Sequence, residues 1–336
     1  MTSKRDPIER AAGSSADLYD VSTWEPRSRL DRFAAWLYAA ISYGLHAIVL
    51  AVALLITISL LASPTFLVLD EPLIGAFFAL SVVPAALLAA YIWYADITTS
   101  EPLSLLVSTF VLAVLFATFA AVTNTFAGSF LRPVPIVGTI LFFYLIVGPV
   151  EEAVKLLAVR VFAFRSDSFD AVIDGAVYGA VAGLGFAAIE NALYITQSVG
   201  TVGAETSLFA AAGGITTTRA LAGPGHVIYS AVAGYYLGLA KFNPANAGPI
   251  VVKGLLVASF IHATYNVTVQ IVPPVIAALW GIGPALAVIV YVVVYDGLAA
   301  FYLYRKLNRY RRTYRAVRDD GGDHGAEMTE FEPGQR

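Results

Sequence analysis

The chain has 336 residues and a formal net charge of −3; 58% of its residues are hydrophobic and only 13% are charged. Soluble globular domains carry about 25% charged residues, so this composition excludes an ordinary soluble protein and indicates a membrane protein. The mean hydropathy of +0.72 agrees with this interpretation. The chain has no cysteine, which excludes disulfides, thiol chemistry and cysteine-type zinc sites. Nothing in the charge pattern indicates a nucleic-acid partner.

Long apolar runs predict an all-α, polytopic membrane helical bundle with about eight transmembrane helices. In chain order the runs cover roughly residues 33–62, 73–94, 103–127, 134–163, 171–195, 216–240, 248–271 and 275–304. Strand-like alternation is absent, and the runs are too long for a membrane barrel. We therefore expect a flexible N-terminal tail at 1–32, a transmembrane domain at 33–304 with a core from about 90, and a C-terminal tail at 305–336.

Lysine and arginine residues predict the orientation of the chain in the cell membrane. Nearly all of them fall in the two tails, near residues 160–165, and between residues 241 and 253. The opposite loops contribute only Arg132 and Arg219. The positive-inside rule therefore places both termini in the cytoplasm.

The C-terminal tail has two halves of opposite charge. Its basic half ends at Arg318, and its acidic half begins at Asp319. We expect the basic half to anchor on anionic lipid of the bilayer and the acidic half to be disordered.

The fourth run contains two adjacent carboxylates, Glu151 and Glu152. Ionised groups in hydrocarbon cost on the order of 3 kcal/mol each and normally face a bundle interior or a watery cavity. As a single helix the run is about 45 Å long, too long for a core of about 30 Å. We expect Gly148-Pro149 to break or kink it and to open a new segment whose dipole favours carboxylates. Lys155 is expected to pair with one of the two glutamates.

Ionisable residues of four predicted helices share one depth. Counted at about 1.5 Å per residue from each cytoplasmic end, Glu151, Glu190, His226 and His262 lie roughly 21, 24, 22 and 21 Å deep. Asn266 follows His262 on the same helical face, and small-residue stripes continue the faces of Glu190 and His226. These residues are therefore predicted to form one cluster inside the bundle, slightly outside the midplane.

Carboxylates with imidazoles and an amide suit hydrolysis. A glutamate takes a proton from water, while a histidine or an asparagine donates to the developing oxyanion or a histidine protonates the leaving amine. The same side chains suit zinc, which would activate a bound water. The residues alone leave both possibilities open, although no HExxH motif supports the metal.

The order of the motifs resembles that of the PrsW family of intramembrane proteases. The motifs are EExxK from Glu151 to Lys155, the segment from Asp174 to Asn191, Gly-His at His226, and HxxxN from His262 to Asn266. The family is similar to the wider CPBP group, which includes the type II CAAX prenyl endopeptidases. The resemblance covers about residues 90–305 and includes Glu101-Pro102. The CAAX pattern prefers EExxxR, so the position of Lys155 favours PrsW.

This resemblance implies an intramembrane endopeptidase whose substrate is a single-pass membrane protein, such as an anti-sigma-factor-like regulator. It implies Glu151 or Glu152 as the general base, His226 and His262 as essential, and Asn266 as supporting. The related CPBP enzymes resemble glutamate proteases with no obligatory metal, which favours a glutamate-activated water over a divalent metal such as zinc.

The remaining polar residues have several possible roles. Glu190 either acts directly or orients a histidine, and in a metal enzyme it would join Glu151, His226 and His262 as a ligand. Lys155 and Asn191 are expected to support the site. Asp170 and Asp174 are expected to end a loop at a helix N-terminus.

Two rival functions stay open at this point. A proton-coupled transporter would use the same residues as a relay, but no convincing internal repeat supports it. A non-catalytic scaffold is the other rival. The loop from about 196 to 218 is expected to face outside and to gate substrate entry. The sequence indicates no oligomeric state.

Overall fold

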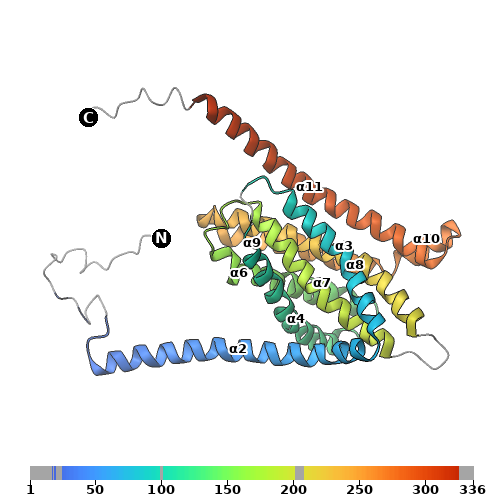
Figure 1. Ribbon diagram of the computed structural model, residues 1–336, viewed down its shortest axis with the longest axis horizontal. Coiled ribbons are helices and arrows are strands. Elements are labelled where there is room, and N and C mark those ends of the chain that lie inside the picture. Colours follow the sequence, from blue (N-terminus) through green and yellow to red (C-terminus); the bar gives the residue numbers. More distant parts are fainter. Residues whose placement is uncertain (1–16, 18, 20–24, 99–100, 201–207, 325–336) are drawn as a thin grey trace. The chain divides into compact units, whose positions relative to one another are not determined.

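The computed structural model describes residues 17, 19, 25–98, 101–200 and 208–324 (Figure 1). Most of the predicted N-terminal tail, residues 201–207 of the predicted gate, and the chain beyond 324 lie outside the described residues. The loop expected at about 196–218 is shorter than predicted, because α7 continues to Gly200 and α8 begins at Leu208. The side chains of the acidic residues from 319 onward are also outside them. The charge-based predictions for those segments therefore stay predictions.

Every regular element of the described chain is a helix, as predicted. The helices are α2 (Arg29–Asp70), α3 (Pro72–Tyr94), α4 (Leu103–Leu131), α5 (Val137–Leu141), the π-helical turn η1 (Phe142–Val147), α6 (Gly148–Val161), the 3-10 turn η2 (Ala163–Arg165), α7 (Asp174–Gly200), α8 (Leu208–Lys241), the 3-10 turn η3 (Pro244–Asn246), α9 (Ala247–Thr268), α10 (Val272–Trp280) and α11 (Pro284–His324). The chain divides into two units, Met1–Leu55 and Ile56–Arg336, and the second holds the predicted site residues.

The described chain contains six helices that are long and apolar enough to cross a membrane. They are Ala47–Asp70, Pro72–Tyr94, Leu103–Leu131, Asp174–Gly200, Pro244–Thr268 and Pro284–Val317. The predicted span 134–163 is instead divided into the short elements α5, η1 and α6, and the predicted span 216–240 lies within α8. The chain is therefore a multi-pass, all-α membrane protein.

The last predicted span, 275–304, has different boundaries in the structure. Gly281 adopts a left-handed conformation with φ of 63°, which separates the short helix α10 from α11. The α11 helix then continues to His324, so residues 305–324, which were expected to belong to the tail, are helical. The apolar pattern alone did not reveal the turn, because residues on both sides of Gly281 are hydrophobic.

The expected break at Gly148-Pro149 is a change of hydrogen-bond register. The segments α5, η1 and α6 follow one another without a gap, and the Gly148 N–H donates to the carbonyl of Phe143, five residues earlier. A π-helical turn accommodates Pro149, which has no N–H to donate. The helix therefore continues past the proline and brings Glu151 into the first turn of α6.

Small residues hold α7 and α8 in close contact near the centre of the second unit (Figure 1). A Cβ on Gly179 would lie 2.3 Å from the carbonyl oxygen of Ser230, and one on Gly183 would lie 2.3 Å from that of His226. The predicted stripes therefore face each other, and the contact sets the backbone of His226 against the helix that carries Glu190.

We expect Gly234→Ala to destabilise the protein. A Cβ on Gly234 would lie 2.0 Å from the carbonyl oxygen of Gly175, and overpacking of this kind costs about 1–3 kcal/mol. The matched control is Gly297→Ala in α11, where a Cβ meets nothing within 4 Å and alanine favours the helix. Thermal unfolding in detergent should show a lower midpoint for Gly234→Ala alone; equal midpoints for the two variants would contradict the contact.

Candidate active site

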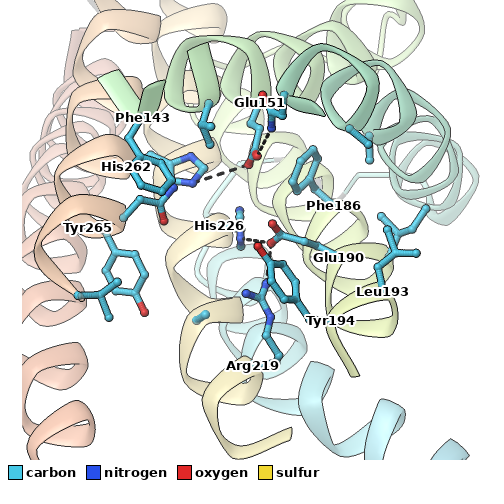
Figure 2. A pocket seen from close by; sticks show the side chains of 18 of the residues that line it. Phe143, Glu151, Phe186, Glu190, Leu193, Tyr194, Arg219, His226, His262 and Tyr265 are labelled. Atoms are coloured by element: carbon cyan, nitrogen blue, oxygen red, sulfur yellow. Dashed lines mark hydrogen bonds and ion pairs between the residues drawn. The ribbon is translucent and has the colours of Figure 1, made fainter. Parts of the chain in front are cut away.

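The two adjacent glutamates of α6 have different surroundings. Successive helical residues point about 100° apart, and here Glu151 lines a cavity of about 560 Å³ whereas Glu152 does not. Figure 2 shows Glu151 directed into this cavity, with His226 and His262 on the neighbouring helices. A close approach of α6 to α9 makes this possible, because a Cβ on Gly148 would lie 2.7 Å from the carbonyl oxygen of Ser259.

Glu152 is fully buried and hydrogen-bonded on both carboxylate oxygens. Its Oε1 accepts from the Lys155 ammonium at 2.8 Å and lies 2.8 Å from Nδ1 of His262. Its Oε2 accepts from the Ser230 hydroxyl at 3.1 Å. A buried carboxylate with three partners that does not line the cavity is placed to position its neighbours.

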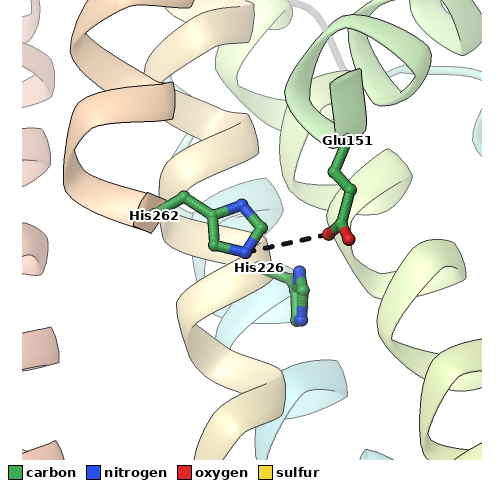
Figure 3. A group of neighbouring side chains, drawn as sticks. All are labelled: Glu151, His226 and His262. Atoms are coloured by element: carbon green, nitrogen blue, oxygen red, sulfur yellow. Dashed lines mark ion pairs between the residues drawn. The ribbon is translucent and has the colours of Figure 1, made fainter. Parts of the chain in front are cut away.

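Glu151 keeps one carboxylate oxygen free. Its Oε1 accepts from the Asn124 amide at 2.9 Å, while its Oε2 has no hydrogen-bond partner among the described residues. The free Oε2 faces Nε2 of His262 at 3.7 Å (Figure 3). The Asn124 contact was not predicted; the signal that could have found it is a single amide in an otherwise apolar stretch of α4.

Hydrogen bonds define the protonation pattern of the two histidines. The Lys155 ammonium, which is only a donor, lies 2.9 Å from Nδ1 of His226, so this nitrogen accepts. The other ring nitrogen of His226 then donates to Glu190 at 2.8 Å. Because the Glu152 carboxylate accepts from Nδ1 of His262, a neutral His262 carries its lone pair on Nε2, toward Glu151.

Arg219 completes the far side of the cavity. It donates to Glu190 at 2.6 Å, and its guanidinium lies 4.3 Å from the centre of the Tyr194 ring; all three side chains are labelled in Figure 2. It also donates to Asn191 at 2.8 Å. The sequence predicts Arg219 at the outer end of the span 216–240, where it is counted with the outer loops. The structure places it within α8, seven residues before His226, and this spacing of two turns was the available signal.

The predicted site residues therefore occupy one region. Ligand atoms of Glu151, His226 and His262 lie within 4.8 Å of one another, and Asn266 also lines the cavity. Asn191 is fully buried behind the cavity wall, where its amide donates to the carbonyl of Ser81.

The same residues include a group of possible metal ligands. Glu151, His226 and His262 have donor types that suit zinc. However, both ring nitrogens of His226 are engaged, one by Lys155 and the other by Glu190. A metal ligated by His226 would have to displace one of these partners. The hydrogen-bonded arrangement therefore does not fit a three-ligand metal site, and Glu190 is bonded to Arg219 instead of joining the group.

We expect Lys155→Met to destabilise the protein strongly, because it leaves Glu152 buried without its cation. Removing one partner of a buried ion pair costs about 3–5 kcal/mol. The double variant Lys155→Met with Glu152→Gln removes the unpaired charge and should be more stable than Lys155→Met alone. Denaturant unfolding in detergent measures both, and simple additivity of the two single effects would argue against the pair.

Comparisons with known proteins agree with this geometry. The family model for the PrsW family intramembrane metalloprotease matches residues 101–298, a range that contains all of the predicted site residues. Protease PrsW of Geobacillus kaustophilus is 28% identical over 186 residues, which are 55% of this chain and 76% of the relative. Protease PrsW of Bacillus subtilis is 25% identical over 198 residues, which are 57% of this chain and 81% of the relative. No solved structure matches. The family match covers more than half of the chain, which therefore belongs to the PrsW family of intramembrane proteases.

Proposed function

We propose that the protein hydrolyses a peptide bond of a single-pass membrane protein with a water molecule that Glu151 activates. The observation that carries this proposal is the free Oε2 of Glu151, which faces His262 at 3.7 Å across the cavity. A general base must reach its water, and Glu151 lines the cavity with an unpartnered oxygen, whereas Glu152 has partners on both oxygens and does not line the cavity.

The proposed reaction begins with proton transfer from the water to Glu151. The water oxygen attacks the carbonyl carbon of the substrate, and the Asn266 amide donates a hydrogen bond to the resulting oxyanion. The proton then passes through Nε2 of His262 to the leaving nitrogen as the C–N bond breaks. Collapse of the oxyanion gives the new carboxyl terminus and the free amine.

The surrounding charges position these groups. Glu152 accepts from Nδ1 of His262 and so turns Nε2 toward the cavity, as a buried carboxylate orients the histidine of other hydrolases. Lys155 binds Glu152 and His226 together. Nε2 of His226 donates to Glu190, and Arg219 binds the same carboxylate from the other side.

The proposal also covers the class of substrate and the orientation of the protein in the membrane. A buried polar cavity between membrane-spanning helices suits a membrane-anchored protein, for example a regulator of the anti-sigma-factor type. The distribution of lysine and arginine supports a location in the cytoplasmic membrane with both termini inside and cleavage in the outer half. Family membership argues against the transporter and the scaffold.

A zinc-dependent protease is the second candidate. It is favoured by the proximity of Glu151, His226 and His262 and by the description of the matching family as metalloproteases. It is disfavoured by the two hydrogen bonds of His226.

Substitution of the two glutamates tests their division of roles. We expect Glu151→Gln to lower the cleavage rate of a reporter membrane protein by at least about 10²-fold, the lower range for a general base, without lowering thermal stability. Glu152→Gln should lower stability as well as activity, because Lys155 loses its carboxylate. A wild-type rate in Glu151→Gln would refute the proposed base.

Metal dependence separates the two candidate mechanisms. We expect the purified enzyme, treated with a zinc chelator and shown to be metal-free by elemental analysis, to retain its rate of reporter cleavage. The matched control is the same sample with zinc restored. Loss of activity on chelation, with recovery on adding zinc, would favour the metal enzyme instead.

The substrate class is tested by comparing membrane proteins in cells that contain the active enzyme or Glu151→Gln. We expect fragments of single-pass proteins, cut within or near their membrane segment, only with the active enzyme. Fragments confined to soluble proteins would contradict this part of the proposal.

A further inference from the structure

A second polar cluster lies near the opposite end of α7, about 24 Å along the helix from Glu190. It consists of Asp96 after α3, Glu101 before α4, and Asp174 at the first residue of α7. One carboxylate oxygen from each lies within 4.8 Å of the others. Two segments that are distant in sequence, the connection between α3 and α4 and the start of α7, therefore bring like charges together, apart from the cavity lined by Glu151.

These carboxylates lack the partners that buried charges normally have. Glu101 is 4% exposed, and neither of its carboxylate oxygens has a hydrogen-bond partner in the described chain; Oδ2 of Asp96 has none either. No Lys or Arg nitrogen of the described chain lies within ion-pair distance of the three. The nearby Lys241 donates instead to the carbonyls of Phe164 and Ser166. The cluster is therefore uncompensated.

Asp174 and Asp96 are partly used by the backbone and by a hydroxyl. Oδ2 of Asp174 accepts from the N–H groups of Asp170 and Ala171, which confirms its predicted place at the helix N-terminus. Oδ1 of Asp96 accepts from the N–H and the hydroxyl of Thr98. The Thr98 hydroxyl also lies 3.4 Å from Oδ1 of Asp174. These bonds fix the two side chains in place and leave Oδ2 of Asp96 without a partner in the described chain.

A phenol provides an independent sign of a ligand. Tyr178 follows Asp174 by one turn on the same face of α7, is completely buried, and its hydroxyl has no hydrogen-bond partner among the described residues. It lies close enough to Glu101 and Asp174 to interact with their charges. An orphaned neutral oxygen beside orphaned carboxylates indicates a missing positive group that binds oxygen.

We propose that Asp96, Glu101 and Asp174 bind a divalent cation that prefers oxygen ligands, such as Mg²⁺ or Ca²⁺. The cluster offers carboxylate and hydroxyl oxygens and no nitrogen or sulfur, a donor set that suits these hard cations. The cation links the connection between α3 and α4 to the start of α7. It thereby holds the helix whose other end carries Glu190 and Asn191.

A proton is the competing explanation. Burial above all, and the charges of Asp96 and Asp174, raise the pKa of Glu101 to about 8. A protonated Glu101 would reduce the repulsion without any metal. The experiment must therefore distinguish a bound cation from a bound proton.

The test is binding of Ca²⁺ and of Mg²⁺ to the purified full-length protein in detergent, after removal of divalent ions. We expect saturable binding of at least one of them, with one ion per chain, and a higher midpoint of thermal unfolding. Glu101→Gln and Asp96→Asn should each weaken the affinity at least about tenfold, since each removes one anionic ligand. The use of two variants covers the case in which one of them does not fold.

Asp167→Asn is the matched control, because Asp167 is exposed in the segment just before α7 and should leave the affinity unchanged. Absence of saturable binding in the wild type, with an unfolding midpoint that depends on pH alone, would overturn the proposal in favour of the proton. Equal affinity in Glu101→Gln and wild type would overturn it as well. Glu151→Gln should bind the cation normally, so this test and the catalytic test fail independently.

Discussion

The proposed catalytic cluster depends on the contacts of the Lys155 ammonium group with Glu152 and His226. Lys155 is 1% exposed and contacts Glu152 at 2.8 Å, His226 at 2.9 Å and the ring of Phe186 at 4.3 Å. One cation thereby joins side chains from α6, α7 and α8. Lys155 compensates the buried charge of Glu152, and this carboxylate accepts from Nδ1 of His262. Lys155 also donates to Nδ1 of His226, so the proton of that ring is on Nε2, which donates to Glu190. Buried charges are tolerated only in such compensated arrangements.

The adjacent glutamates illustrate how one short motif serves two purposes. A helix directs neighbouring residues about 100° apart, so one carboxylate enters the protein interior while the next faces the cavity. The interior carboxylate, Glu152, is saturated with hydrogen bonds and gives rigidity. The cavity carboxylate, Glu151, accepts from Asn124 on one oxygen, and its other oxygen, which has no partner in the described chain, is the proposed base. A preorganised site needs both the rigid carboxylate of Glu152 and the free carboxylate oxygen of Glu151.

Sequence reasoning located the cluster because depth along a membrane helix follows directly from residue number. It did not find the contacts of Asn124 or Arg219, because these depend on the lateral packing of α4 and α8, which periodicity does not determine. The sequence predicts a break or kink at Gly148-Pro149, whereas in the structure a π-helical turn precedes the proline and the helix continues past it. Asp174 was assigned correctly to a helix start, but the folding of Asp96 and Glu101 onto it needs the three-dimensional structure.

The most direct test of the account is an experimental structure of the enzyme with anomalous scattering data at the zinc edge. The account predicts a water, and no metal peak, within hydrogen-bond distance of Oε2 of Glu151 and Nε2 of His262. It also predicts that Lys155 remains bonded to Glu152 and His226. A metal peak among Glu151, His226 and His262, with His226 released from Lys155 or Glu190, would contradict it, as would a cavity lined by Glu152 in place of Glu151.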